Sequence, residues 1–110
     1  MSKTSLTALQ SHQLEIAVHA PSGRSAHTIV GGPEKVMRQT VIALRGGSRL
    51  SEHENPGEAT VQVLHGRVEL TAGQDTWNGL PGDLLVVPDS RHALEAIEDS
   101  VVLLTVAKHQ

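Results

Sequence analysis

From about residue 26 onward, apolar and polar residues alternate with a period of two, in short runs divided by turn-forming sequences. Alternate residues of a strand point to opposite faces, so these runs predict strands with one buried face. Most of the dividing sequences contain a glycine. The predicted strands cover residues 26–30, 38–44, 59–64, 67–71, 76–80, 84–87, 92–97 and 101–107. Short strands at this regular spacing are typical of a β-sandwich or a β-barrel.

The amino-acid composition limits what can fill the interior of such a fold. The chain has 110 residues, which is enough for one domain, and it contains no Phe or Tyr and a single Trp, at position 77. Its core must therefore be built from Val, Leu, Ile and Ala. The β-branched side chains among them favour pleated sheets, in agreement with the alternating pattern.

The first 25 residues differ from the remainder. Apolar residues at near-helical spacing between Ser5 and Ala20, followed by Pro21-Ser-Gly23, predict one short amphipathic helix. We therefore divide the chain into an N-terminal helical segment, 1–25, and a β-domain, 26–110. The last predicted strand, 101–107, is apolar on both faces, so a second layer must cover it. The helix or a second copy of the chain could supply this layer, and we expect a homodimer.

Charge and cysteine content exclude several classes of function. The formal net charge is -3, with both signs interspersed, so the chain lacks the basic stripe that nucleic-acid binding requires. It contains no cysteine, so any bound metal would need nitrogen or oxygen ligands. No apolar run approaches the roughly 20 residues that span a bilayer. We expect a cytoplasmic protein that contacts neither membrane nor nucleic acid.

Two stretches that contain glycines carry the residues best suited to binding or catalysis. The first, from Gly47 to Gly66, contains His53 and Asn55, which share one side of an extended backbone because they are two residues apart. The second runs from Gly82 to His92. A closed sheet would bring the two imidazoles of His53 and His92 to one pocket.

Together these stretches resemble the two sequence signatures of the cupin family. The first signature is a glycine, five residues, His-x-His, three or four residues, Glu, six residues and a glycine, and its spacing matches from Gly47 to Gly66. Asn55 replaces its second histidine and Ala59 its glutamate, while Glu58 lies one place earlier. Strict alternation turns Glu58 outward, and a β-bulge would be needed to bring its carboxylate back.

The second signature is a glycine, five residues, Pro-x-Gly, two residues and a histidine. Gly82 and Pro88 match it, whereas Ser90 replaces the inner glycine and His92 arrives one residue early. The asparagine that closes this signature falls on Ala96. A shortened turn would still deliver the imidazole, with His92, Leu94 and Ala96 facing inward.

The resemblance implies an all-β fold: a double-stranded β-helix, or jelly-roll cupin barrel, preceded here by a short N-terminal α-helix. Its site would lie in the barrel mouth. Many cupins hold Fe, Mn, Ni, Zn or Cu there with three histidines and a carboxylate. The corresponding candidate metal ligands are His53, His92, Asn55 and Glu58. A site with only two imidazoles would be weak and open.

Three functions are compatible with this sequence. The first is a protein that binds or senses a small molecule in an aliphatic barrel and has a degenerate metal site. The second is a metal-dependent enzyme, a dioxygenase or an isomerase, that uses His53 and His92 as ligands. The third is a stress or regulatory protein that acts through its dimer surface.

Each candidate residue also has a purely structural interpretation. The two histidines would be hydrogen-bonded remnants of a lost site, and Asn55 would form the turn before Pro56. Glu58 would be a solvated residue at a strand start. Arg91, beside His92, would be exposed at a strand start or would clamp an anion at the barrel mouth.

Overall fold

The computed structural model describes residues 2–53 and 57–108, and for residues 52 and 53 it describes the backbone. One helix and nine strands follow one another in this part of the chain. They are α1 (Leu6–His19), β1 (Arg24–Val30), β2 (Met37–Leu44), β3 (Arg49–His53), β4 (Gly57–His65), β5 (Val68–Ala72), β6 (Asp75–Gly79), β7 (Leu84–Val86), β8 (His92–Ala96) and β9 (Ser100–Lys108). The expectation of an N-terminal helix followed by strands is therefore confirmed.

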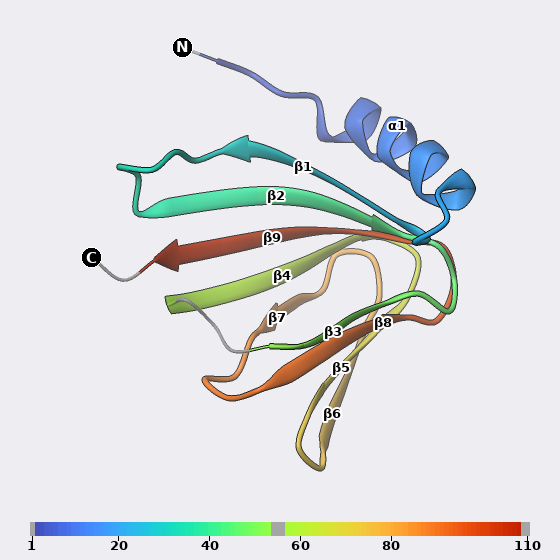
Figure 1. Cartoon of the computed structure of the whole chain (residues 1–110), viewed down its shortest axis with the longest axis vertical. Helices are drawn as coiled ribbons and strands as arrows, with labels where there is room; N and C mark the ends of the chain where they lie inside the picture. The colour runs from blue at the N-terminus through green and yellow to red at the C-terminus, as the bar shows by residue number, and fades with distance from the viewer. Residues whose placement is uncertain (1, 54–56, 109–110) are drawn as a thin grey trace.

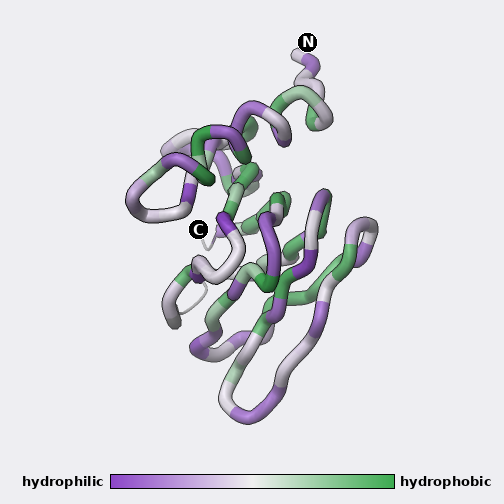
Figure 2. Tube along the Cα trace, turned by 90° about the vertical axis from the view of Figure 1, so that its right-hand side faces the viewer, coloured by the Kyte–Doolittle hydropathy of each residue, from purple (hydrophilic) through white to green (hydrophobic). Residues whose placement is uncertain are grey.

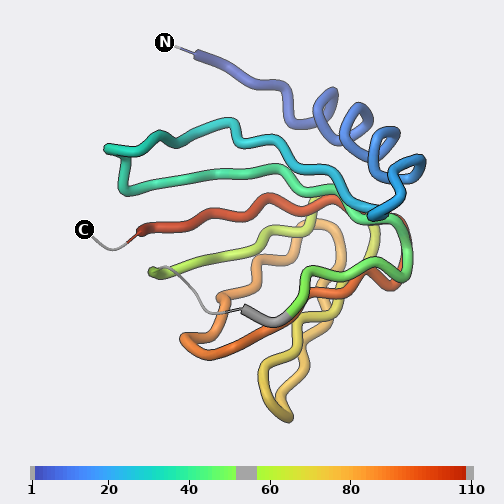
Figure 3. The backbone as a smooth tube through the Cα atoms, in the orientation of Figure 1, coloured from blue at the N-terminus to red at the C-terminus, as the bar shows by residue number. Residues whose placement is uncertain are grey.

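The strands form two antiparallel sheets that pack face to face. One sheet has the order β1-β2-β9-β4-β7 and the other the order β3-β8-β5-β6 (Figure 1). Each sheet contains neighbours that are distant in the chain, as in β2 beside β9 and β3 beside β8. Figure 3 shows the same path as a continuous tube, with α1 outside the larger sheet. This is a jelly-roll barrel, as the sequence predicted.

Eight of the nine strands coincide with predicted ones, and β3 is the exception. Its sequence, Arg-Leu-Ser-Glu-His, has a single strongly apolar residue, Leu50, so it shows no alternation. Pairing with β8 makes it a strand, with Leu50 opposite Leu94. Long-range pairing, which local sequence patterns do not report, thus decides this element.

The interior of the barrel is filled by alternate residues of both sheets. Figure 2 shows hydrophobic and hydrophilic segments alternating along the strands, as a barrel with a dry interior requires. The buried residues of this cluster are Ile42, Leu44, Ala59, Val61, Val63, Val68, Leu70, Val87, Leu94, Ala96, Val102 and Val106. All of them are aliphatic, which confirms the core predicted from composition.

Helix α1 covers the outer face of the larger sheet. Ala17 is fully buried there against Val41, Ala43, Val101 and Leu103, in a second apolar cluster. The Ser25 hydroxyl donates a hydrogen bond to the Gln13 side chain and ties β1 to the helix. The helix begins after Ser5, whose Oγ accepts a hydrogen bond from Ala8 N at 3.2 Å. The helix therefore supplies a layer over the outer face of the last strand, as one of the two predicted alternatives requires.

No helix in the described part of the chain is both long enough and apolar enough to cross a bilayer.

The three signature glycines all occupy left-handed backbone conformations. Gly47, Gly66 and Gly82 have φ angles of +90°, +82° and +93°. A residue with a Cβ atom pays a steric penalty at such angles, whereas glycine does not. At Gly66 space is also lacking, because an added Cβ would meet the Asp99 carbonyl oxygen and Ser100. The spacing of these three glycines thus indicates where tight turns connect the barrel strands.

Strand β7 leaves one edge of the larger sheet exposed. Its apolar residues Leu84 and Val86 are 61% and 74% exposed. Edge strands with exposed apolar residues pair readily with other chains. We therefore expect this edge to form the predicted homodimer.

Replacing Val86 with lysine is expected to convert that dimer into a monomer, because a charge would be buried at the interface. Sedimentation velocity should report twice the chain mass for the native protein and the chain mass for Val86→Lys. Ile97→Lys, which changes an exposed isoleucine in the loop between β8 and β9, is the control and should stay dimeric. A native protein that sediments as a monomer at micromolar concentration would contradict the expectation.

Candidate functional site

His92 lies inside the barrel at its open end. It is the first residue of β8 and is only 5% exposed, as the sequence predicted for an inward-facing imidazole. Its Nδ1 lies 2.9 Å from the carbonyl oxygen of Ser90. Because a carbonyl only accepts, Nδ1 carries the proton, and Nε2 is the unprotonated nitrogen when the ring is neutral. The shortened turn after Pro88 therefore fixes both the position and the tautomer of the ring.

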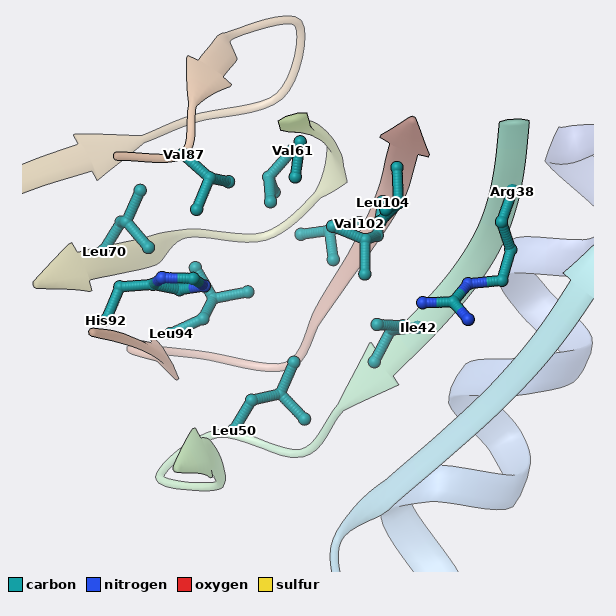
Figure 4. A pocket seen from close by; sticks show the side chains of 12 residues that line it. Arg38, Ile42, Leu50, Val61, Leu70, Val87, His92, Leu94, Val102 and Leu104 are labelled. Atoms are coloured by element: carbon teal, nitrogen blue, oxygen red, sulfur yellow. The ribbon is translucent and has the colours of Figure 1, made fainter. Parts of the chain in front are cut away.

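A cavity of about 100 Å³ lies beside His92 between the two sheets. Ten of its twelve lining residues are aliphatic, and they come from β2, β3, β4, β5, β8, β9 and the position directly after β7 (Figure 4). The aliphatic residues are Ile42, Leu50, Ala59, Val61, Leu70, Val87, Leu94, Val102, Leu104 and Val106. The two polar lining residues are His92 and Arg38. The described wall is thus a hydrophobic surface with two nitrogen-bearing groups.

Arg38 enters this cavity from the sheet opposite His92. It is the second residue of β2 and shares a face with Ile42 and Leu44, two residues of the barrel interior. Figure 4 shows its side chain approaching from β2 while His92 approaches from β8. Among the described residues, no hydrogen bond or ion pair engages the Arg38 guanidinium, and no buried side-chain polar atom lacks a partner. The half-buried guanidinium therefore keeps its contact with solvent at the open end.

Sequence reasoning did not find Arg38, although a signal was present. Positions 38, 40, 42 and 44 alternate along one predicted strand, and Ile42 and Leu44 mark their face as the buried one. An arginine on that face is a candidate site residue by the same alternation. Arg91, the candidate for anion binding, is exposed and is not among the lining residues of the cavity.

The backbone places His53 and His92 side by side. His53 is the last residue of β3, and the register of β3 and β8 sets it directly opposite His92. The side chain of His53 is not among the described parts of the chain. Asn55 lies outside the described residues altogether. The predicted meeting of two imidazoles in one pocket therefore stays a prediction, with the register as its support.

Glu58 lies on the opposite face of β4 from the cavity. It is exposed, whereas the adjacent Ala59 is 6% exposed and lines the cavity. The pairing of β4 with β9 runs without a register shift from Gly57 to Val63, so no bulge turns Glu58 inward. Glu58 and Asp89 line a neighbouring pocket, which shares Ala59 and Val87 with the cavity. The structure thus brings Ala59, and not Glu58, to the cavity that His92 lines.

The described wall does not fit the metal site of three histidines and a carboxylate. Of its lining residues, only His92 carries a metal-ligating group, and the glutamate position is the methyl group of Ala59. Among the described side chains, those of residues 2–51 and 57–108, no group of three His, Cys, Asp or Glu lies close enough to hold a metal ion. The Arg38 guanidinium adds a permanent positive charge, which disfavours a cation in the same cavity.

Four exposed histidines and the tryptophan lie outside the cavity. His12, His19, His27 and His65 are exposed, and none of them lines the cavity. Trp77, on β6, is 41% exposed and is likewise not a lining residue. The only indole of the chain is therefore no platform for a ligand in this cavity.

Comparison with solved structures gives many similar folds. A conserved protein of unknown function from Streptococcus pyogenes is 32% identical, with a TM-score of 0.74 over 83% of this chain and 79% of the other. A cupin superfamily protein from Desulfitobacterium hafniense is 18% identical, with a TM-score of 0.72 over 78% of each chain.

A larger protein contains the same fold as one part. The salicylate 1,2-dioxygenase of Pseudaminobacter salicylatoxidans has a TM-score of 0.76 and 19% identity over 91% of this chain, but over only 33% of its own. No protein-family model and no curated protein matches the sequence significantly. The two facing sheets, the glycine turns of both signatures and the structural neighbours described as cupins show that this chain has the fold of a small cupin.

Proposed function

We propose that this cupin binds or senses a small molecule in the cavity between its two sheets. The observation that supports this function best is the composition of the cavity wall, which has ten aliphatic residues and two polar ones. Ligand sites are typically concave and mostly apolar, with a few polar groups that orient the ligand. The cavity also lies at the open end of the barrel, where His92 begins β8 and Arg38 lies near the start of β2.

The size of the cavity limits the ligand. An engineered apolar cavity of about 150 Å³ takes up benzene, which has about six non-hydrogen atoms. In proportion, the 100 Å³ observed here accommodates about four such atoms. A short branched aliphatic group matches this volume, and a polar head group would remain at the open end. The ligand is therefore smaller than most enzyme cofactors.

Titration with isobutyramide tests this proposal, because it is a neutral molecule with a four-carbon body. Chemical shifts of the methyl groups of Val61, Leu94 and Val102 should change on titration, with a dissociation constant of about 1 mM. Val61→Leu, which adds a methylene to the wall, should weaken binding several-fold. The matched control is Val86→Leu on the exposed edge, which should leave the affinity unchanged. If these methyl chemical shifts do not change at isobutyramide concentrations up to about 100 times that dissociation constant, the proposal is overturned.

A metal-dependent enzyme is the second candidate, because His53 lies opposite His92 in the register of β3 and β8. Directly opposed residues of an antiparallel pair share one face of a sheet, so two imidazoles could serve one ion. The fold is also shared with a protein described as a salicylate 1,2-dioxygenase. The ions to be considered are Fe, Mn, Ni, Zn and Cu.

Metal analysis of protein purified without chelator separates the two candidates. If the protein binds its ligand without a resident metal, we expect well under one metal ion per chain. The double substitution His53→Ala and His92→Ala should then leave this metal content unchanged. A nearly stoichiometric metal content that this double variant loses would instead support the enzyme. His65→Ala with His27→Ala, which removes two exposed imidazoles, is the control for nonspecific metal binding.

A further inference from the structure

We infer that the cavity selects a small carboxylic acid in its ionised form, with the carboxylate bound by Arg38 and a short aliphatic body lying among the valines and leucines. This inference rests on the proposed function and specifies its ligand. Two features carry it: the charge balance of the cavity wall, and the surroundings of the guanidinium.

The charge of the described wall is positive and uncompensated. Arg38 is always protonated in proteins. No described carboxylate lines the cavity, since Glu58 lies on the outer face of β4 and the remaining ten lining residues are aliphatic. His92 is either neutral or positively charged, and neither form repels an anion. An anionic ligand would therefore supply the counter-charge that the described residues do not.

The aliphatic part of the Arg38 side chain packs against protein, and its N–H donors are available to a ligand. Its Cβ and Cγ lie beside Gly31, and a Cβ atom added to that glycine would lie 3.6 Å and 3.2 Å from them. The β2 register fixes Arg38 opposite Val106, another lining residue of the cavity. Its guanidinium forms no hydrogen bond or ion pair with the described residues. A planar guanidinium positioned in this way matches the two oxygens of a carboxylate.

The apolar wall determines the rest of the ligand. An inorganic anion would satisfy Arg38 but would leave the aliphatic surface of Val61, Leu94 and Val102 without a partner. A short branched acid satisfies both, because its four carbons match the cavity volume and its oxygens reach the open end. Isobutyrate is the simplest acid with this shape.

Three probes with nearly the same shape and different charge test the inference: isobutyrate, isobutyramide and isobutylamine. At pH 7.5, isobutyrate should bind the native protein about tenfold more tightly than isobutyramide, because its hydrogen bond to Arg38 is charge-assisted. Isobutylamine should bind most weakly. Methyl chemical shifts measure all three affinities in one experiment.

Arg38→Met keeps a long apolar stem and removes the charge, so it should abolish the preference for isobutyrate over isobutyramide. Arg67→Met removes an exposed arginine that does not line the cavity, and it should keep that preference. If Arg38→Met does not fold, Arg38→Gln provides the same neutralisation. Arg38→Lys retains the charge and should retain part of the preference.

The outcomes separate this inference from the proposed function. Equal affinities for isobutyrate and isobutyramide in the native protein, or a preference that survives Arg38→Met, would overturn the carboxylate inference and leave a neutral binder. Tighter binding of isobutylamine would do the same. If none of the three probes shifts the cavity methyl groups, both the inference and the proposed function fail.

Discussion

Replacing Leu44 with alanine is expected to lower the free energy of unfolding by about 3 to 5 kcal/mol. Leu44 is fully buried at the end of β2, where it packs in the interior cluster and does not line the cavity. Because aliphatic neighbours surround it, its removal leaves a void that the barrel fills only in part. Chemical denaturation followed by far-UV circular dichroism measures the change.

Leu84→Ala is the matched control for this prediction. The chemical change is identical, but Leu84 is 61% exposed on the edge strand β7. Its substitution should alter the unfolding free energy by no more than about 0.5 kcal/mol, measured at a protein concentration low enough for both variants to be monomeric. Similar losses for Leu44→Ala and Leu84→Ala would contradict the division into a packed interior and an exposed edge.

Replacing Gly66 with alanine is expected to cost about 4 kcal/mol of stability, for two separate reasons. Its φ angle of +82° strains any residue with a Cβ atom, at a cost of about 1 to 3 kcal/mol. The new methyl group would also collide with the Asp99 carbonyl oxygen and with Ser100, and overpacking adds about 1 to 3 kcal/mol. Ser100 cannot move freely, because its hydroxyl accepts a hydrogen bond from the Arg67 amide and donates one to the Arg67 carbonyl oxygen.

Gly47→Ala separates these two contributions. Gly47 has a similar φ angle of +90°, but no atom lies within 4 Å of the position that its Cβ would take. Its substitution should therefore cost only the backbone strain, about 1 to 3 kcal/mol. Thermal unfolding of both variants measures the difference. A Gly47 variant as unstable as the Gly66 variant would show that the crowding at Gly66 is unimportant.

Local sequence patterns predicted much of the fold because most of its strands bury one face. The runs that became β2, β4 and β9 alternate or are wholly apolar, and the glycines at 47, 66 and 82 mark turns that only glycine adopts without strain. The inward position of His92 also followed from alternation, despite the shortened turn before it. These features depend on residues close together in the chain.

Features that depend on distant pairing escaped prediction. Strand β3 has one strongly apolar residue and exists through its pairing with β8. Alternation placed Arg38 on the buried face of its strand, but an arginine near a strand end ordinarily reaches solvent, and the packing of β2 against the opposite sheet is what brings it to the cavity. The first cupin signature contains a glutamate and begins at Gly47, after Arg38. The family resemblance therefore directed attention to Glu58 and not to the positive charge of Arg38 in the cavity wall.

A crystal structure of the protein with isobutyrate tests the central claim most directly: the ligand site is the cavity between the two sheets, with Arg38 and His92 as the polar groups of its described wall. The account predicts density for the aliphatic body among Val61, Leu94 and Val102, with carboxylate oxygens about 2.7 to 2.9 Å from the Arg38 guanidinium. An empty cavity, or isobutyrate bound only on the outer faces of the sheets, would contradict it.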